Sequence, residues 1–367
     1  MSIKIILEKI FENINLTTKT GIIVASPSDE PDYKYHWIRD SALVMRPIIH
    51  QYKLTNDAKY FQTILNYLEV ETNIQKLPGI SGLGEPKINT DGTSFTGDWG
   101  RPQNDGPALR GIMLLKIINI FEDKYLTIIN NVIVPVLKKD IKYIIENYKK
   151  PSFDLWEENY GWHWYTRMVQ CKFLKECIEH YTYISDSFDK KQLSKIYHIL
   201  LDNLIDHING DSIISSFGVN GEIVRYEDAA NILAYCHIDY DPDIMRHFPI
   251  KLLKHTSTNL VEYFRKKYNN PTINLIGRYK DDKYYNGQIW VICSLALAQY
   301  YMFLFNINKE EQYYYTIANT IMEKIISLDP NLILPEQFDP NTNEYFSAKK
   351  LTWNYSELYE LKKNLKK

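Results

Sequence analysis

Two adjacent glutamates lie among aromatic residues in the stretch FDLWEENYGWHWYT, residues 153–166. Glu157 and Glu158 directly follow Trp156, and a third acid, Asp154, precedes them. Burial beside an indole ring and nearby like charge both favour the protonated form of a carboxyl group. A carboxyl group that keeps its proton near neutral pH can act as a general acid. The stretch therefore indicates acid–base chemistry or sugar binding, whereas a glutamate pair without such neighbours would be read as a solvated surface pair.

The composition of the chain points to an uncharged ligand. Its 367 residues include 43 basic and 45 acidic side chains, for a formal net charge of −2. Such a balance gives no field that would attract nucleic acid or an anionic membrane, so we expect neither as a partner. The 29 tyrosines, 7 tryptophans and 14 phenylalanines suit both helix packing and contact with the apolar faces of sugars.

The start of the chain predicts an amphipathic helix, because charged residues such as Lys4 and Glu8 interrupt its apolar residues. It therefore does not resemble a signal peptide, and no run of about 18 apolar residues predicts a membrane span. The cysteines lack metal-site spacing and predict buried, reduced thiols. The histidines also lack such spacing, so we expect no metal and no cofactor. We expect the protein to be intracellular. The cysteines are Cys171, Cys177, Cys236 and Cys293.

Helical periodicity recurs from end to end and predicts about twelve helices. Pro107 and the sequence NKEE at 308–311 are typical helix starts, and Asn220-Gly221 predicts the turn of one short hairpin. No clear linker divides the chain, so we expect a single domain over residues 1–367. The predicted helices span residues 3–15, 40–52, 56–73, 106–122, 125–148, 162–183, 188–208, 226–238, 256–269, 286–306, 308–329 and 349–363.

The polar aromatic residues concentrate between these helices. A rigid helical scaffold that presents such loops is suited to carry a binding or catalytic site. The segment 77–106 is too long for a simple connection, which also indicates a functional loop. The five loops span residues 26–40, 77–106, 151–162, 277–287 and 334–353.

In these loops the chain resembles glycoside hydrolase family fifteen, the glucoamylases. The resemblance is colinear from Gly21 to about Tyr359 and implies an all-α fold, an (α/α)6 barrel with the active site at one end. We expect no starch-binding module. The matching segments are GIIVASPSDEPDYKYHWIRDSALV, GLGEPKINTDGTSFTGDWGRPQNDGPALR, FDLWEENYGWHWYT, IGRYKDDKYYNGQIW and LPEQFDPNTNEYFSAKKLTWNYSELY.

The resemblance implies two catalytic glutamates. Glu157 matches the general acid and Glu336 the general base of inverting hydrolysis, in which the two carboxyl groups lie about 6.5 to 9.5 Å apart. Glu336 is then expected to stay ionised, and Tyr33 matches a tyrosine that hydrogen-bonds the base. Glu158 matches a residue that binds sugar hydroxyls. Asp154 either tunes the acid or caps a following helix.

Further matches imply a closed, glucose-binding pocket. Arg39 and Asp40 match the pair that holds the terminal glucose, although Asp40 could instead cap a helix beginning at Ser41. Arg278 matches another hydroxyl-binding arginine. Asp98 departs from the small polar residue usual in the family and adds a negative charge near the pocket. The matching sugar-contacting aromatic residues are Trp37, Trp99, Trp156, Tyr284, Trp290 and Trp353.

The implied activity is the release of β-D-glucose from nonreducing ends of α-1,4-glucans such as glycogen and maltooligosaccharides, by a monomer. Another α-glucosidase specificity of the same family, such as trehalase or dextran glucosidase, is the nearest alternative. A further alternative is a catalytically silent carbohydrate-binding regulator, like the related domains in the regulatory subunits of phosphorylase kinase. The presence of both Glu157 and Glu336 argues against this regulator.

Overall fold

Two concentric sets of helices build the protein. The computed structural model describes residues 2–14, 16–17 and 19–365. Within them, twelve α-helices of nine residues or more alternate along the chain between an outer and an inner position. The outer helices are α1 (Ile3–Ile14), α3 (Ala58–Ile74), α6 (Val134–Asn147), α8 (Lys190–Ile205), α11 (Leu253–Lys267) and α13 (Gln312–Ile326). The inner helices are α2 (Ile38–Thr55), α4 (Gly106–Phe121), α7 (Trp164–Glu179), α9 (Ala229–His237), α12 (Val291–Ile307) and α14 (Thr352–Leu365).

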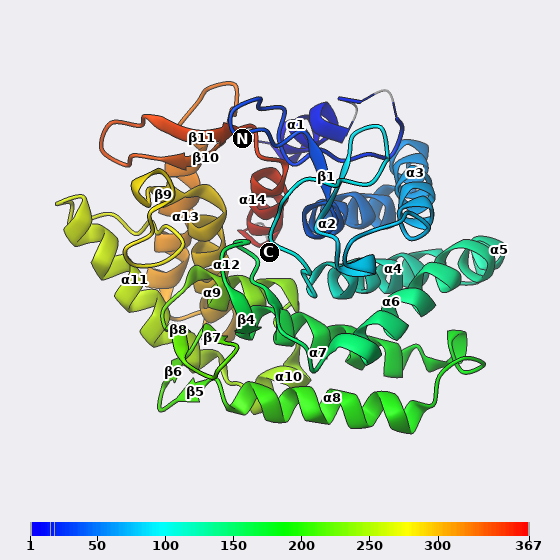
Figure 1. The fold of residues 1–367 in the computed structure, drawn as a ribbon. Helices are drawn as coiled ribbons and strands as arrows, with labels where there is room; N and C mark the ends of the chain where they lie inside the picture. The colour runs from blue at the N-terminus through cyan, green and yellow to red at the C-terminus, as the bar shows by residue number, and fades with distance from the viewer. Residues whose placement is uncertain (1, 15, 18, 366–367) are drawn as a thin grey trace.

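The inner helices form a closed ring. Each of them contacts the next one along the chain, and α14 returns to contact α2 (Figure 1). Each outer helix packs on an inner neighbour, as α13 does on α12 and α1 on α14. The predicted (α/α)6 barrel is thereby confirmed.

The sequence explains which helices take the inner positions. The inner helices α4 and α12 carry apolar residues on all sides, and a helix of this kind is stable only when it is surrounded by protein. The outer helices α1 and α6 bury one face and leave the other to solvent. One continuous core cluster joins both sets, and all four cysteines in it are buried and free.

Several local predictions need correction. The predicted helix at 125–148 is interrupted, because a wider π-helical turn (Ile129–Ile133) separates α5 (Leu126–Ile128) from α6. Asn308 does not begin α13 as a capping box; it ends α12, and α13 starts at Gln312. The six-residue helix α10 (Pro242–His247) was not predicted. Short 3-10 turns occupy η1 (Gly82–Gly84), η2 (Glu122–Tyr125), η4 (Tyr181–Tyr183), η5 (Ile250–Leu252) and η6 (Tyr284–Asn286).

Small antiparallel sheets order the loops at one end of the barrel. The predicted hairpin is confirmed as β7 and β8, with Gly221 at a φ of +84° in its turn. Residues 162 and 163, predicted as the start of the helix at 162–183, instead end the strand β4, which pairs with β3 and β7. The sheets are β1 (Tyr35–Trp37) with β2 (Lys87–Asn89); β3 (Ser152–Phe153), β4 (Tyr160–His163), β7 (Ser216–Gly218) and β8 (Ile223–Arg225); β5 (Ile208–Asn209) with β6 (Ser212–Ile213); and β9 (Ile289–Trp290), β10 (Pro335–Phe338) and β11 (Tyr345–Lys349).

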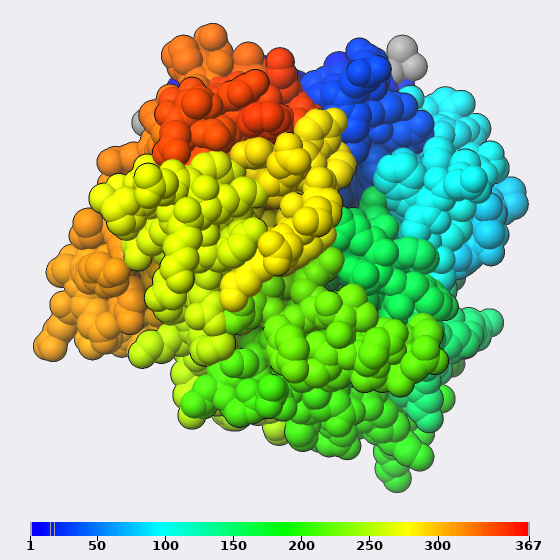
Figure 2. Space-filling model, turned by 60° about the vertical axis from the view of Figure 1, so that its left-hand side comes forward, coloured from blue at the N-terminus to red at the C-terminus, as the bar shows by residue number. Residues whose placement is uncertain are grey.

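These strands place the loops at the N-terminal ends of the inner helices. The helices α2, α7 and α12 begin directly after β1, β4 and β9. Figure 2 shows the N-terminal segment in blue, the segment 77–106 in cyan and the segment 277–287 in yellow meeting on one face of the molecule. The five polar aromatic loops are thus brought together although they are spread over more than 300 residues of sequence.

The two ends of the described chain are joined by buried hydrogen bonds. The Asn13 amide donates to the Lys350 carbonyl oxygen and to Thr352 Oγ1, each at 2.7 Å. The Thr352 backbone N–H donates to the Ala25 carbonyl oxygen at 2.8 Å. These contacts fix α14 against the N-terminal segment. Within the residues described, no helix combines the length and the apolar character needed to cross a membrane.

Candidate active site

A cavity of about 620 Å³ opens among the five loops. This volume is in the range of pockets that bind small ligands. Thirteen of the fourteen residues that the sequence predicted for the site line it, and Asp154 is the exception. The thirteen are Tyr33, Trp37, Arg39, Asp40, Trp99, Trp156, Glu157, Glu158, Arg278, Tyr284, Trp290, Glu336 and Trp353.

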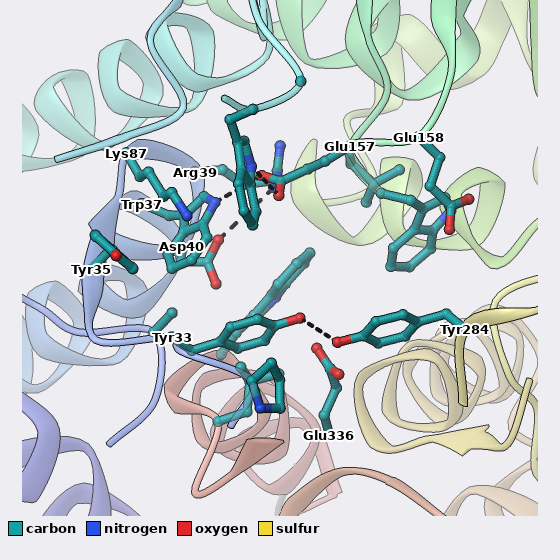
Figure 3. A pocket seen from close by; sticks show the side chains of 18 of the residues that line it. Tyr33, Tyr35, Trp37, Arg39, Asp40, Lys87, Glu157, Glu158, Tyr284 and Glu336 are labelled. Carbon is teal, nitrogen blue, oxygen red and sulfur yellow. Dashed lines mark hydrogen bonds and ion pairs between the residues drawn. The ribbon is translucent and has the colours of Figure 1, made fainter. Parts of the chain in front are cut away.

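The two glutamates matched to the acid and the base lie on opposite walls of the cavity (Figure 3). Glu157 stands in the turn between β3 and β4, whereas Glu336 is on β10. A sugar placed in the cavity would therefore have one carboxyl group on each side. Carboxyl groups on opposite sides of the sugar are one requirement of inverting hydrolysis.

Four donors converge on the Glu157 carboxyl group. Trp37 Nε1 donates to Oε1 at 2.7 Å and Trp99 Nε1 donates to Oε2 at 2.6 Å. Gln103 and Arg39 also donate to Oε1, at 3.0 and 3.3 Å. From the sequence, Asp154 and Glu158 were expected to place like charge beside the Glu157 carboxyl group. In the structure, the side chains of both acids bind arginines instead.

Asp154 shapes the turn that carries Glu157. Its carboxylate accepts the backbone N–H of Glu158 at 2.8 Å and that of Asn159 at 3.1 Å. Glu157 itself has a φ of +66°, a left-handed conformation that is unfavourable for a residue with a side chain. Asp154 therefore caps this turn. It does not cap a helix, because β4 follows and α7 begins only at Trp164.

Arg225 on β8 is a residue of the site that the sequence did not reveal. Its guanidinium donates to Asp154 at 3.3 Å, to Asp228 at 3.0 Å and to Glu158 at 3.1 Å. It also lies 3.5 Å from the centre of the Tyr279 ring. One arginine thus ties the hairpin to the turn that carries Glu157. The only sequence signal was a charged residue in the apolar run IVRY.

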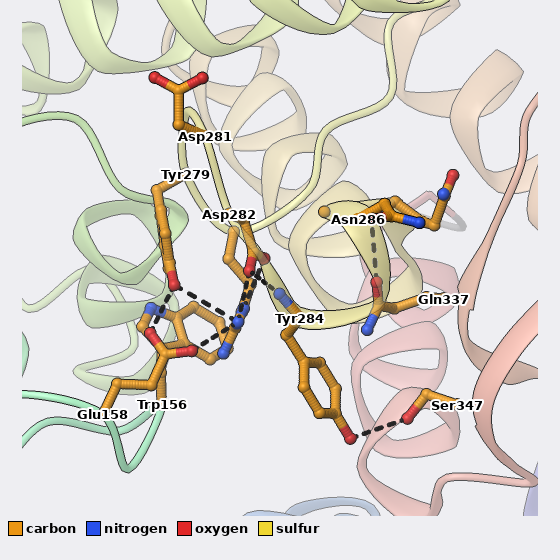
Figure 4. A network of polar contacts seen from close by, with 12 residues as sticks. Trp156, Glu158, Tyr279, Asp281, Asp282, Tyr284, Asn286, Gln337 and Ser347 are labelled. Carbon is orange, nitrogen blue, oxygen red and sulfur yellow. Dashed lines mark hydrogen bonds and ion pairs between the residues drawn. The ribbon is translucent and has the colours of Figure 1, made fainter.

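Glu158 belongs to a second arginine network, drawn in Figure 4. Arg278 Nη2 donates to Glu158 Oε1 at 2.7 Å. The same guanidinium makes two hydrogen bonds to Asp282, at 2.8 and 2.7 Å, in a bidentate pair. Asp282, four residues after Arg278, was missed by the sequence prediction. Its pairing holds Arg278 at the cavity wall.

Arg39 and Asp40 lie in the first turn of α2, at the inner part of the cavity. Arg39 Nη1 donates to Asp105 at 2.7 Å, a pairing not predicted from the sequence, and its Nε is 3.9 Å from Asp40 Oδ2. Burial raises the pKa of Asp40 to about 7, although Arg39 opposes this shift. The alternative that Asp40 caps a helix starting at Ser41 is wrong, because α2 already begins at Ile38.

The buried environment of Glu336 bears on the expectation that its carboxyl group stays ionised. Burial raises the pKa of Glu336 to about 7, and hydrogen bonds from Ser347 and Tyr33 and the charge of Arg278 offset only part of this effect. Ser347 Oγ donates to Glu336 Oε2. A carboxyl group with this pKa is only partly ionised at neutral pH. The expectation that Glu336 stays ionised therefore holds only above about pH 7.

A buried lysine, also unpredicted, forms part of the cavity wall. Lys87 Nζ lies 3.2 Å from the ring centre of Trp99 and 4.4 Å from that of Trp37. Tyr35 and Phe95 complete the surrounding rings, at 4.1 and 4.4 Å. Burial lowers the pKa of Lys87 to about 8. These rings stabilise the ammonium group by cation–π attraction.

The remaining aromatic residues pack side by side around the cavity. Trp156 and Trp290 contact each other edge to face, with ring centres 5.5 Å apart. Trp353 Nε1 donates to the buried Glu357 at 2.9 Å, and this hydrogen bond fixes the orientation of the Trp353 ring. In the described part of the chain, no group of three or more His, Cys, Asp or Glu side chains could hold a metal ion.

The profile of the family described as glycosyl hydrolases family 15 matches residues 3–362. The chain belongs to glycosyl hydrolase family 15. It is 30% identical to a probable glucoamylase of Schizosaccharomyces pombe, over 92% of this chain and 83% of that protein. It is also 30% identical to an intracellular, sporulation-specific glucoamylase of Saccharomyces cerevisiae, over 84% of this chain and 64% of that protein.

A solved structure agrees with this family 15 assignment at the level of the fold. The glucoamylase from Saccharomycopsis fibuligera superposes with a TM-score of 0.87. The superposition covers 99% of this chain and 94% of that structure, at 24% sequence identity. The fold of this chain is therefore that of the solved glucoamylase.

Proposed function

We propose that this family 15 hydrolase is an exo-acting, inverting glucosidase that releases β-D-glucose from the nonreducing ends of α-1,4-glucans, including glycogen and maltooligosaccharides. The observation that carries the proposal is the placement of Glu157 and Glu336 on opposite walls of one cavity. The glucoamylases among its relatives support the choice of glucan as substrate.

In this mechanism, Glu157 protonates the glycosidic oxygen while the bond from that oxygen to the anomeric carbon breaks. Glu336 removes a proton from a water molecule, whose oxygen bonds to the anomeric carbon from the opposite face. One proton leaves Glu157 and one arrives at Glu336, so charge and atoms balance. Attack from the opposite face inverts the anomeric configuration and gives β-D-glucose from an α-linkage.

The inner part of the cavity is suited to hold the terminal glucose. Arg39 Nε and Trp290 Nε1 are buried and have no hydrogen-bond partner among the described residues. Buried donors of this kind gain stability when they bond to an acceptor, and sugar hydroxyls supply acceptors. With Asp40 and Arg278, they can fix a nonreducing end, which accounts for an exo mode of action.

The proposal also covers the domain organisation, the oligomeric state and the location of the enzyme. We propose a single-domain monomer that acts inside the cell on a neutral glucan, without a nucleic-acid or membrane partner. Near-neutral charge supports the neutral ligand, and one continuous core supports the single domain. Light scattering of the purified protein and fractionation of the producing cells would test the oligomeric state and the location.

The decisive experiment follows the anomer of glucose released from maltotriose by NMR. Initial appearance of β-glucose supports the proposal, and initial α-glucose contradicts it. Glu157→Gln and Glu336→Gln are each expected to lower kcat by about 10²- to 10⁴-fold. Because fluoride leaves without a proton donor, Glu157→Gln should lose far less activity on α-glucosyl fluoride than on maltose.

The alternative functions give different results in the same assays. A trehalase or a dextran glucosidase would release glucose faster from trehalose or isomaltose than from maltose. A silent carbohydrate-binding regulator would bind maltooligosaccharide without releasing glucose, and Glu157→Gln would then change nothing.

A further inference from the structure

Asp98 lines the cavity at its mouth, next to Trp99. It is exposed, and no hydrogen bond or ion pair engages its carboxylate among the residues described. The other acids that line the cavity differ in this respect, since Glu157 and Glu158 bind several donors and Glu336 binds Ser347. Asp98 therefore presents a free negative charge to any molecule that passes through the mouth.

The position of Trp99 shows which part of a substrate would meet this charge. Trp99 binds Oε2 of Glu157 from the outer side, and 37% of its surface is exposed. Arg39, by contrast, approaches Oε1 of Glu157 from the inner side and is 4% exposed. If the terminal glucose lies against Arg39, the leaving group extends past Trp99. Asp98 is thus placed beside the leaving group.

The loop that carries Asp98 is held in place at both ends. Arg101 donates to the Gly97 carbonyl oxygen at 2.9 Å and to Glu85 at 3.0 Å. Gln103 donates to the Gly100 carbonyl oxygen at 2.9 Å. These bonds flank Asp98 on either side in the sequence. The backbone at Asp98 therefore keeps a defined position relative to Glu157.

Among the residues described, no cation pairs with the Asp98 carboxylate. Lys87 Nζ is buried against the ring of Trp99, Arg101 pairs with Glu85, and Lys34 pairs with Asp29. Asp32, a second exposed acid, also lines the cavity and adds to the negative potential. Like charges at a binding site lower the affinity for an anionic ligand.

We propose that Asp98 is a specificity-determining residue that favours neutral leaving groups and discriminates against leaving groups that carry phosphate or carboxylate. The proposal rests on the glucosidase function proposed above. Glucan chains with anionic substituents next to the cleaved bond are then poor substrates, whereas unmodified chains are hydrolysed normally.

Two substrates with open-chain leaving groups test this directly, because maltitol and maltobionate differ mainly in one carboxylate. The wild-type enzyme should show a higher kcat/KM for maltitol than for maltobionate. Asp98→Asn should reduce the ratio by about five-fold, as expected for one unit charge about 4 Å away that is screened by bulk water. Asp98→Glu should keep the ratio, and 1 M salt should reduce it in the wild type.

Asp202→Asn is the matched control, because it removes the same charge from an exposed position on the outer helix α8. It should leave the ratio unchanged. If the ratio of kcat/KM for maltitol to that for maltobionate is equal in the wild type and in Asp98→Asn, while maltose is still hydrolysed, the specificity role of Asp98 is overturned. The proposed glucosidase function would then stand. No release of glucose from maltose by the wild type would overturn the proposed function and the assignment with it.

Discussion

The hydroxyl groups of Tyr33 and Tyr284 lie 2.9 Å apart beside the Glu336 carboxyl group, although 251 residues separate them in the sequence (Figure 3). Tyr284 also contacts Ser347 Oγ at 3.1 Å, and Ser347 donates to Glu336. A chain of hydroxyl groups thus ends at the proposed base. These donors favour the ionised carboxylate, against the effect of burial.

The activity should depend on pH through the ionisation of Glu336. Since the proposed base must be ionised and the pKa of Glu336 is raised to about 7, kcat/KM for maltotriose should rise as pH increases through about 7. Ser347→Ala removes a donor to the carboxylate, so it should raise this pKa further and move the rise to higher pH. A shift to lower pH would contradict the assigned role.

Asp40 provides the control for this profile, because burial also raises its pKa to about 7. Asp40→Asn removes that titration. If the rise in kcat/KM near pH 7 persists in Asp40→Asn, it belongs to Glu336; if it disappears, Asp40 is the group that titrates.

Arg225 is predicted to act as a positioning residue. Arg225→Met removes its bonds to Asp154, Glu158 and Asp228 but keeps an apolar side chain against Tyr279. Displacement of the turn by about 1 Å should lower kcat/KM by about 10- to 100-fold. Arg246→Met, at an exposed surface pair, should retain full activity. Unchanged kinetics in Arg225→Met would refute this role.

Arg110 is predicted to matter for stability rather than for catalysis. It is buried between α3 and α6, where it binds Glu71 at 3.0 Å and Asp140 at 2.9 Å. Arg110→Met leaves both acids without this partner and should lower the free energy of unfolding by about 3–5 kcal/mol in denaturant titrations. Lys142→Met breaks only an exposed pair with Glu146 and should cost less than about 0.5 kcal/mol.

Lys87 should make stability depend on pH in the alkaline range. Its pKa is lowered to about 8 in the folded protein, whereas an unfolded lysine keeps its proton to about pH 10.4. Between these values the unfolded chain binds more protons, so the contribution of Lys87 to stability rises with pH. The Tm of the wild type minus that of Lys87→Met should therefore increase from pH 7.5 to pH 10.

Lys191→Met, on an exposed position of α8, supplies the matched comparison for this measurement. Its Tm difference from the wild type should stay constant over the same pH range. A constant difference for Lys87→Met as well would show that this lysine does not titrate there.

The twelve long helices could be predicted because their periodic apolar residues are a local signal. The strands could not, with the exception of the hairpin around Gly221, because segments of two to five residues are too short to show alternation. The end of β4 illustrates this limit, since Trp162 and His163 continue into α7 and were predicted as the start of that helix.

Most residues of the site were predicted because they match family motifs. Asp105, inside such a motif, and Arg225, outside one, were missed because their importance comes from contacts across the fold. Asp105 binds Arg39 across 66 residues, and Arg225 binds Glu158 across 67. Likewise, the raised pKa of Glu336 results from burial, which depends on every element around it. Neither pairing nor burial of this kind is encoded in a short stretch of sequence.

The return of α14 to α2 has a consequence for biosynthesis. The ribosome releases β10 and α14 after the other five inner helices, and these late elements carry Glu336 and Trp353. Until they dock against the segment that was made first, one wall of the cavity is missing. The cavity of the nascent polypeptide is therefore incomplete until β10 and α14 have been made and have docked.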